Sequence, residues 1–412
     1  MKKQNQQPTR AKFPVFRQLC NLIPTHLVPQ LARQYGIDLQ SRSFSPWSHL
    51  IGLLYAQFTH AIGLNDVVDG LRLHSGLLWT VRGATAPSKN GFSYANRNRN
   101  PALAEDLFWG MLEHLKGLCP AFAGGSGRRL AGRFTRSIQV VDSTVLELIA
   151  SCVDWAEHRR RKAAAKCHVR LDLQSFLPRF VLVDSARHAD GYHAPAVCAG
   201  LKAGEIVIFD RAYVDFKHLH QLTQRGVFWV TRAKDKYHKF RVVKKLLRKP
   251  EGKILSDDLV MLKVPATRAG HPERLRRVVA LVEVDGKEIE MTFLTNNFQW
   301  ASSSVAALYR ERWSIEVFFK QLKQTLQVTD FLGNNAQAVR WQVWTALLMY
   351  LLLRFQAAVS RWTGSMTRLW ALVRSALWLK LDVGDLVKSY GIAGGHLRLV
   401  TRPEAAYLPG FG

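Results

Sequence analysis

Cysteine is scarce in this sequence and never paired. Only 5 of the 412 residues are cysteine, and none falls in a Cys-x-x-Cys pair. Their odd number and scattered spacing argue against a disulfide framework or a cysteine zinc site, and favour a reducing compartment. A secretory signal is also not expected, because the basic N-terminus MKKQNQQPTRAKF lacks an apolar run.

A long hydrophobic run is also missing. The most apolar segment, Trp341–Leu353, reads WQVWTALLMYLLL and is followed at once by Arg354. It falls short of the roughly 20 apolar residues that a helix needs to cross a bilayer. We therefore expect a buried core helix here and no membrane association.

Acidic residues are few. Lys and Arg total 58 against 31 Asp and Glu, which gives a formal net charge of +27. The excess positive side chains repel one another unless a polyanion binds to the surface, and nucleic acid is the commonest such partner. A protein kept in solution by its charge, or one bound to acidic lipid, would have the same composition. The 48% of hydrophobic residues argues against a disordered chain.

Hydrophobic periodicity changes several times along the chain, from helical to strand-like and back. Ser45-Pro46 is a typical helix start, and a Gly-rich stretch near residue 125 marks a boundary. The pattern predicts an α/β protein in five parts: a helical N-terminal domain at 1–130, the first part of a layered α/β core at 131–231, a β-rich insertion at 232–292, the second part of the core at 293–340, and a helical C-terminal region at 341–412.

Two acids follow apolar, β-branched runs that are typical of buried strands. Asp142 comes after IQVV and Asp210 after IVIF. Functional groups gather at the carboxyl ends of strands in open α/β sheets, and buried carboxylates are costly unless paired or metal-bound. Each Asp is therefore a candidate metal ligand. Either could instead begin a turn or cap a helix, as Asp210-Arg211 would.

A third acid lies in the segment YRERWSIEVFFKQLKQTL, which begins at Tyr309. At about 100° per residue, Tyr309, Arg312, Glu316 and Lys323 fall within about 60° of one another on a helix, with Lys320 nearby. Glu311 points about 140° away from Glu316 on the same geometry. This polar stripe suits a metal ligand beside phosphate contacts. An amphipathic helix with an Arg312–Glu316 pair fits the spacing equally well.

These residues resemble the signature of the insertion sequence 4 family of transposases. Tyr309, Arg312, Glu316 and Lys323 match its Y-(2)-R-(3)-E-(6)-K pattern without a gap. Asp142 in VVDST and Asp210 in IFDRAY stand where that family has its first two acids. The family's second box often reads Asp-Arg-Gly-Tyr, so Ala212 is a departure. Lys166-Cys167-His168 is similar to its Lys-x-His strand.

The resemblance implies a ribonuclease H-like catalytic core, interrupted by the β-rich insertion, between helical N- and C-terminal regions. It implies that the N-terminal domain recognises transposon ends and that the C-terminal region pairs protomers, giving a homodimer in the DNA complex. Double-stranded DNA, as transposon ends and target, would be the partner. The compartment would be the bacterial cytoplasm, at the nucleoid.

The site implied by the resemblance holds two Mg²⁺ or Mn²⁺ ions on three catalytic carboxylates. Asp142 and Asp210 would hold one ion, and Asp142 and Glu316 the other. Water would cut the transposon end, and the 3′-hydroxyl released would then join target DNA by in-line displacement. The implied DNA contacts are Tyr309, Arg312, Lys320 and Lys323.

Some members of that family stack a flipped base on an aromatic residue of the insertion while forming a DNA hairpin. The aromatic and apolar residues available for this in the present sequence are Met291, Phe293 and the later Trp300, so a hairpin step is in doubt.

His168, His188 and His193 are disfavoured as a metal cluster, since no pair has helical ligand spacing.

Further candidate DNA contacts are the basic runs at 128–136, 159–166, 232–249 and 274–277, and the residues Lys89, Arg97 and Arg99.

Two alternatives to a transposase are a ribonuclease H-like nuclease or resolvase, and a catalytically silent transposase derivative that only binds DNA.

Overall fold

The computed structural model describes residues 8–37, 44–123, 134, 136–148, 157–158, 162–234, 238–247, 249–284, 286–325 and 332–390. Contacts divide the chain into two compact units. Unit 1 takes residues 1–123, 146–164 and 319–412, and unit 2 takes residues 124–145 and 165–318. Each unit is therefore assembled from segments that are far apart in the sequence.

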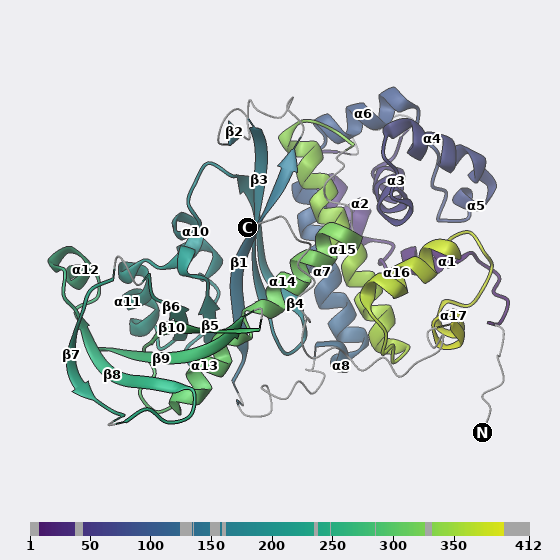
Figure 1. The fold of residues 1–412 in the computed structure, drawn as a ribbon. Coiled ribbons are helices and arrows are strands. Elements are labelled where there is room, and N and C mark those ends of the chain that lie inside the picture. The colour runs from purple at the N-terminus through teal and green to yellow at the C-terminus, as the bar shows by residue number, and fades with distance from the viewer. Residues whose placement is uncertain are drawn as a thin grey trace, which may run out of the picture. The chain divides into compact units, whose positions relative to one another are not determined.

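Unit 1 is helical, and helices from both ends of the chain pack together in it (Figure 1). Its elements are α1 (Val15–Cys20), α2 (Leu27–Gln34), α3 (Pro46–Thr59), α4 (Leu64–Leu73), α5 (Ser75–Trp79), α6 (Lys89–Asn98), α7 (Ala102–Leu118), α8 (Pro120–Ala123), α15 (Ala336–Val359), α16 (Met366–Ser375) and α17 (Val383–Tyr390). The predicted start of α3 is confirmed, because Ser45 accepts a hydrogen bond from the Ser48 N–H and Pro46 is the first helical residue.

The central helix of unit 1 is α15, which contacts α3, α6, α7 and α16. It is 24 residues long, and by length and composition alone it passes the test for a membrane-spanning helix. However, 83% of its most apolar window is buried within the protein. The helix is longer than its apolar run suggested, and its burial agrees with the core helix predicted from the sequence.

One mixed sheet lies mainly in unit 2, with β2 and the adjoining ends of β1 and β3 assigned to unit 1. Its strands are β1 (Ile138–Leu148), β2 (Glu157–His158), β3 (Lys162–Asp172), β4 (Leu177–Ser185), β5 (Ile206–Phe209), β6 (Phe228–Arg232), β7 (Phe240–Lys245), β8 (Ile254–Leu262), β9 (Leu275–Val284) and β10 (Lys287–Thr295). The order is β2-β3-β1-β5-β6-β10-β9-β8-β7, and β4 pairs with β3. β1, β5 and β6 run parallel, whereas β3–β4 and the strands from β6 to β7 are antiparallel.

The segment predicted as a β-rich insertion continues this sheet. β10 returns antiparallel to β6, with Phe293 opposite Arg232 and Thr295 opposite Val230. The remaining elements of unit 2 are α10 (Asp190–Val197), the short 3₁₀ helix η4 (Arg211–Tyr213), α11 (Phe216–Gln224), α12 (Pro265–Gly270), α13 (Ser302–Arg310) and the first half of α14 (Trp313–Thr325). A mixed α/β fold is thus confirmed.

Part of the core of unit 2 lies between the parallel strands and helices α10 and α11. Val207 and Trp229 of the sheet are fully buried there against Val197 and Leu219 of the helices. α10 begins at Asp190, and an acidic side chain in the first turn favours a helix N-terminus. This start also places Asp190 beside the functional residues described below.

Candidate active site

Strand register brings Asp142 and Asp210 together. In the parallel pair β1–β5, Val141 lies opposite Phe209, so the two acids are the next residues on neighbouring strands. β5 ends at Phe209, whereas β1 runs on to Leu148, so Asp142 sits within its strand rather than at its end. Asp210 also caps η4, accepting a 3.0 Å hydrogen bond at Oδ2 from the Ala212 N–H. Capping and a place in the acid cluster are therefore compatible.

Arg312 joins all three predicted carboxylates. Its Nη1 donates to Asp142 Oδ2 at 2.9 Å, and its Nη2 donates to Glu316 Oε1 at 2.7 Å. Its Nε lies 4.0 Å from Asp210 Oδ1. The guanidinium, 13% exposed, is thus the positive centre of an acid cluster formed by Asp142, Asp210 and Glu316.

The helix that supplies this cluster is not continuous, which corrects the prediction of one helix from Tyr309 onward. α13 ends at Arg310 and α14 begins at Trp313, with Glu311 and Arg312 in a turn between them. The Arg312 N–H bonds the Tyr309 carbonyl at 3.0 Å, a tighter i→i+3 contact than an α-helix makes. Because of this turn, helical angles alone do not describe how Arg312 reaches Asp142.

Burial and charge repulsion act together on Asp142. The pKa of its carboxyl is raised to about 7: burial raises it most, Arg312 and the Ser143 N–H lower it, and the neighbouring Asp210 and Glu316 add to the rise. The pKa of Arg312 is raised: burial lowers it, but Glu316 and Asp142 outweigh that effect. A bound cation would favour the ionised form of Asp142, because it offsets the repulsion from the neighbouring carboxylates.

Tyr309 lies against the insertion strand β10. Its ring is 5.0 Å from that of Phe293, which is fully buried, and the Arg312 guanidinium lies 5.9 Å from its centre. Burial raises the pKa of Tyr309 to about 12, so its hydroxyl stays protonated. Met291 and Phe293, the insertion residues considered for base stacking, are both buried. Both belong to β10, and Phe298, which follows that strand in the sequence, is exposed.

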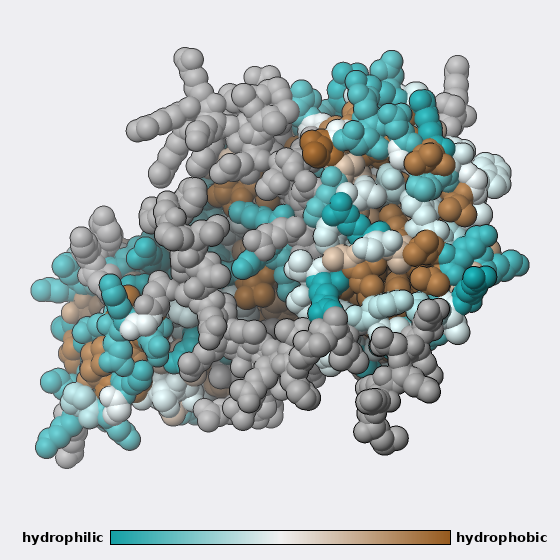
Figure 2. Space-filling view, turned by 45° about the vertical axis from the view of Figure 1, so that its right-hand side comes forward, coloured by the Kyte–Doolittle hydropathy of each residue, from teal (hydrophilic) through white to brown (hydrophobic). Residues whose placement is uncertain are grey.

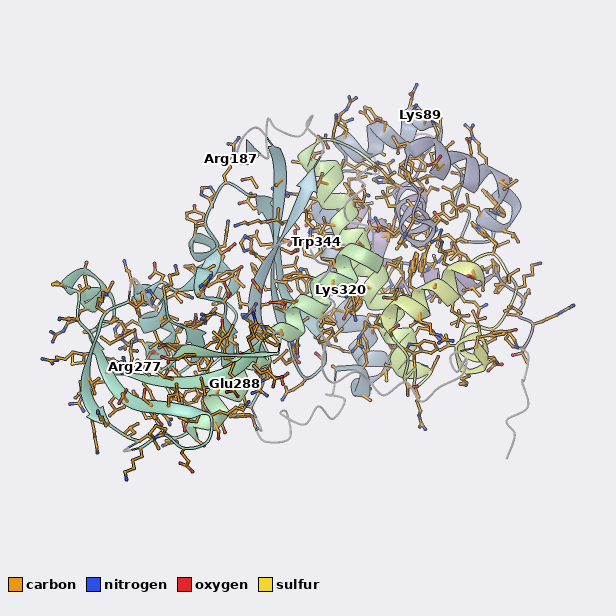
Figure 3. All side chains as sticks on the ribbon, viewed as in Figure 1. Lys89, Arg187, Arg277, Glu288, Lys320 and Trp344 are labelled. Carbon is orange, nitrogen blue, oxygen red and sulfur yellow. The ribbon has the colours of Figure 1, made fainter. Side chains whose placement is uncertain are left out.

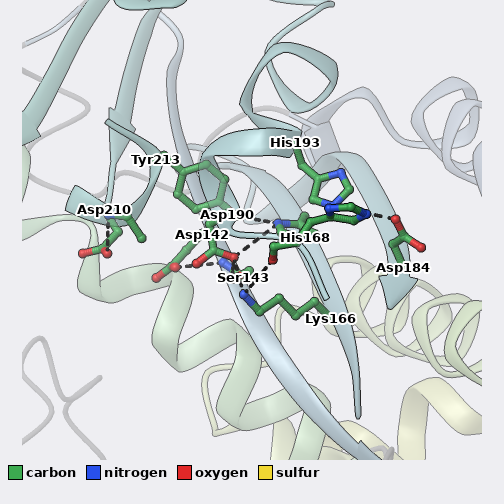
Figure 4. A network of polar contacts seen from close by, with 11 residues as sticks. Asp142, Ser143, Lys166, His168, Asp184, Asp190, His193, Asp210 and Tyr213 are labelled. Atoms are coloured by element: carbon green, nitrogen blue, oxygen red, sulfur yellow. Dashed lines mark hydrogen bonds and ion pairs between the residues drawn. The ribbon is translucent and has the colours of Figure 1, made fainter. Parts of the chain in front are cut away.

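A second polar network borders the acid cluster and was not predicted from the sequence (Figure 4). Asp190 Oδ1 accepts a hydrogen bond from the Ser143 hydroxyl at 2.8 Å and from Lys166 Nζ at 3.0 Å. Ser143 follows Asp142 on β1, and its N–H donates to Asp142 Oδ1 at 2.8 Å. Asp190 is therefore linked to Asp142 through one residue.

The Lys-x-His motif at 166–168 and the Asp-Arg-Ala-Tyr motif at 210–213 contact each other in this network. His168 Nδ1 lies 2.7 Å from the Tyr213 hydroxyl, so the Lys-x-His strand contacts the Asp-Arg-Ala-Tyr turn. Burial lowers the pKa of His168 to about 4, which keeps the ring neutral. The His168 and His193 rings lie 4.5 Å apart.

A bound metal ion requires several ligating side chains to lie close together. Among the described residues, no group of three or more His, Cys, Asp or Glu side chains has the arrangement of a formed metal site. The three predicted carboxylates instead surround the Arg312 guanidinium. Their chemistry still suits a divalent ion, since hard carboxylate oxygens are the ligands that Mg²⁺ and Mn²⁺ prefer.

Lys320 and Lys323 lie further along α14, beyond the limit of unit 2. Lys320 is exposed and Lys323 is half-buried. They follow Glu316 at the i+4 and i+7 positions of the same helix.

Several basic residues that the sequence offered as DNA contacts instead bind acidic side chains or backbone carbonyls within the protein. Arg276 is buried and forms a two-pronged pair with Asp257, and Arg277 pairs with Asp258 at 2.8 Å. Arg99 is buried and donates to the Phe44 and Ser45 carbonyls. Residues 128–133, 135, 159–161, 235–237 and 248 of the basic runs lie outside the described part of the chain.

Comparison with known families identifies the domain that contains these residues. Residues 133–352, just over half of the chain, match the family model described as the transposase DDE domain. The chain belongs to the DDE transposase family. All three candidate carboxylates of this transposase lie within the matched range. Residues 12–81 match a second model, a domain of unknown function (DUF4372).

Curated proteins similar to this chain are also named as transposases. The predicted transposase y4zB of Sinorhizobium fredii is 29% identical over 315 residues, covering 76% of this chain and 84% of the relative. The predicted transposase of insertion sequence element IS5377 from Geobacillus stearothermophilus is 28% identical over 225 residues, covering 54% and 57%. Among solved structures, the piggyBac transposase synaptic complex with hairpin DNA matches with a TM-score of 0.44 at 10% identity, covering 90% of this chain and 83% of that one.

Proposed function

We propose that this transposase moves its element by cut-and-paste transposition, as a member of the insertion sequence 4 family. Asp142, Asp210 and Glu316 would be the catalytic carboxylates, and residues 309–323 the Tyr-Arg-Glu-Lys signature of that family. The observation that carries the proposal is the convergence of three carboxylates, from β1, the end of β5 and α14, on one guanidinium.

A ribonuclease H-like core would hold these residues. The parallel strands β1 and β5 carry the first two acids side by side, and α14 supplies the third. Residues 131–231 and 293–340 would form this core, and residues 232–292 its insertion. The helical residues 1–130 would recognise transposon ends, and residues 341–412 would pair two protomers into a homodimer on DNA. The bacterial nucleoid would be the place of action.

Asp142 and Asp210 would share one Mg²⁺ or Mn²⁺ ion, and Asp142 and Glu316 would share a second. Such a pair of ions, when bound, supplies activation of the attacking oxygen and stabilisation of the leaving oxygen. The ionised form of Asp142 is the ligand, so its proton must leave before an ion binds. The acid cluster thereby exchanges a proton and an Arg312 contact for metal.

Arg312 would have two successive partners. Without metal it would offset part of the negative charge of the acid cluster. With DNA bound, it and Lys323 would contact phosphates of the transposon strand, with Lys320 close by on α14. Tyr309, held between Phe293 and Arg312, would donate its protonated hydroxyl to a phosphate oxygen.

The test is an end-cleavage and joining assay. The full chain is incubated with Mg²⁺ or Mn²⁺, DNA carrying the element's ends, and a target plasmid, with Asp142→Ala as the control. Cut ends and joined products are expected from the wild type and neither from the variant. Cleavage without joining would support a ribonuclease H-like nuclease instead, and binding without cleavage a silent derivative. Equal cleavage by Asp142→Ala would exclude the proposed site.

A further inference from the structure

The outer face of α6 in unit 1 is made almost wholly of hydrogen-bonding side chains. This helix, KNGFSYANRN, is the uppermost helix of unit 1 in Figure 1. Its exposed side chains are Lys89, Asn90, Ser93, Tyr94, Arg97 and Asn98. Lys89 points away from the ribbon in Figure 3. Tyr94, 53% exposed, is the face's one large partly apolar side chain.

The segment around α6 carries no negative charge. From Arg82 to Ala104 the sequence contains four cations and no Asp or Glu. Two of the cations, Arg82 and Arg99, turn inward to backbone carbonyls. The other two, Lys89 and Arg97, are exposed on the helix itself. The outer face of α6 is therefore positively charged.

The inner face of α6 fixes the helix firmly. Phe92 is fully buried and packs so closely that a Cβ added at Gly52 of α3 would lie 3.2 Å from its ring. Asn96 is buried and bonds His49 Nε2 at 2.8 Å. Burial lowers the pKa of His49 to about 3, so this bond is made by a neutral ring. The outer side chains thus stand on a rigid element, as a recognition surface requires.

The last turn of α6 is held by α15. The Asn335 side-chain amide donates to the Arg97 carbonyl at 3.1 Å, and the Trp341 indole donates to the Arg99 carbonyl at 2.9 Å. Both contacts use backbone carbonyls of the α6 segment. They leave the Arg97 guanidinium directed outward, where it is exposed.

The side chains on the outer face of α6 indicate what kind of molecule this face could bind. A protein interface has an apolar core, and the outer face of α6 has no aliphatic side chain. Exposed apolar residues of unit 1, such as Ile62, Leu73 and Trp79, stand on other segments. In Figure 2, hydrophilic residues cover the upper edge of unit 1 and apolar patches lie below it.

DNA offers the matching chemistry. Arg and Lys pair with guanine, Asn pairs with adenine, and Ser accepts either role at base edges in the major groove, which admits one α-helix. We propose that α6 enters the major groove of double-stranded DNA and reads its sequence through Asn90 and Arg97, with Lys89 on a phosphate. This inference rests on the proposed transposase function and names the reading helix within it.

The experiment is a selection from a library of DNA duplexes with a randomised core. The full chain is used as wild type and as Asn90→Ala, Arg97→Ala and Lys89→Ala. Arg33→Ala is the matched control, because Arg33 is an exposed arginine on α2 of the same unit. Thermal melting of each variant checks that the fold is retained, which is expected since all four side chains are exposed.

The wild type is expected to enrich one sequence motif. Asn90→Ala and Arg97→Ala should each lose preference at one or two positions, by about 5- to 150-fold, the discrimination of one bidentate contact. Lys89→Ala should weaken binding to all sequences evenly and reduce the salt slope by about 1. Arg33→Ala should enrich the wild-type motif.

Two results would overturn the role of α6: the wild type selecting no motif, or the α6 variants selecting the wild-type motif with wild-type affinity. Neither would count against transposition if end cleavage and joining still occur on DNA that carries the element's ends, because that assay does not depend on which helix reads the DNA. Loss of cleavage and joining, with a motif still read by α6, would overturn the proposed function alone.

Discussion

Arg312 donates a 2.9 Å hydrogen bond to Asp142, a residue 170 positions earlier in the chain. The two side chains are 13% and 17% exposed, so the contact is largely shielded from water. Because the same guanidinium bonds Glu316, one arginine links a carboxylate on a strand to a carboxylate on a helix.

Removing this arginine should destabilise the protein in a pH-dependent way. Arg312→Ala leaves Asp142 buried without its cation, at a cost of up to about 3 kcal/mol in the free energy of unfolding. The pKa of Asp142, already about 7, should rise further, because Arg312 lowers it. A folded-state pKa above the unfolded value means that stability is lost as pH rises.

The loss caused by Arg312→Ala should therefore be larger at pH 8 than at pH 5.5, as measured by urea unfolding. Arg310→Ala is the control, since Arg310 ends α13 and is exposed. An equal loss at both pH values would show that Arg312 does not act on an ionising Asp142.

Metal binding should depend on pH through Asp142. Its carboxyl has a pKa of about 7 in the metal-free protein, so protons compete with the ion below that pH. The Mn²⁺ affinity of the full chain should rise as pH increases from 5.5 to about 7 and then level off above about 8. Titration calorimetry in buffers of different ionisation enthalpy should also detect proton release. An affinity that is flat across this range would contradict the raised pKa.

The hydroxyl and the ring of Tyr309 should have separable roles. Tyr309→Phe keeps the packing against Phe293 and should change the free energy of unfolding by less than about 0.5 kcal/mol. Tyr309→Ala empties a buried aromatic site and should cost about 3 kcal/mol or more. Thermal unfolding compares the two variants.

End cleavage by Tyr309→Phe then tests the phosphate contact. A fall of about 10-fold is expected for one lost hydrogen bond to a charged group. Wild-type cleavage by Tyr309→Phe would leave the residue with a packing role only.

Asp190, whose side chain is 18% exposed, should contribute to stability. Asp190→Ala removes the partner of both Ser143 and Lys166, and hydrogen bonds to charged groups contribute about 1.5–3 kcal/mol. Asp190→Asn retains an acceptor for Ser143 and should lose less. Urea unfolding measures both. Asp66→Ala serves as a reference, since Asp66 only caps the exposed start of α4. A loss for Asp190→Ala no greater than this reference would show that the network contributes little.

The sequence alone determined the elements and the residue types of the site. Apolar β-branched runs predicted β1 and β5, and Ser45-Pro46 predicted the start of α3, because burial and capping are local properties. Asp142, Asp210 and Glu316 were singled out in the same way, from position relative to those runs and from the signature they resemble.

Only the tertiary structure decided how these residues meet. The turn at Glu311–Arg312 interrupts the predicted helix, and no local pattern required it. The pairing of Asp190 with Ser143 and Lys166 joins three segments through strand register and the start of α10. Likewise, Arg276 belongs to a basic run and Arg99 was considered as a DNA contact, but both are buried. A charge in a sequence does not say which side of a helix or sheet it will occupy, because packing of distant segments sets that.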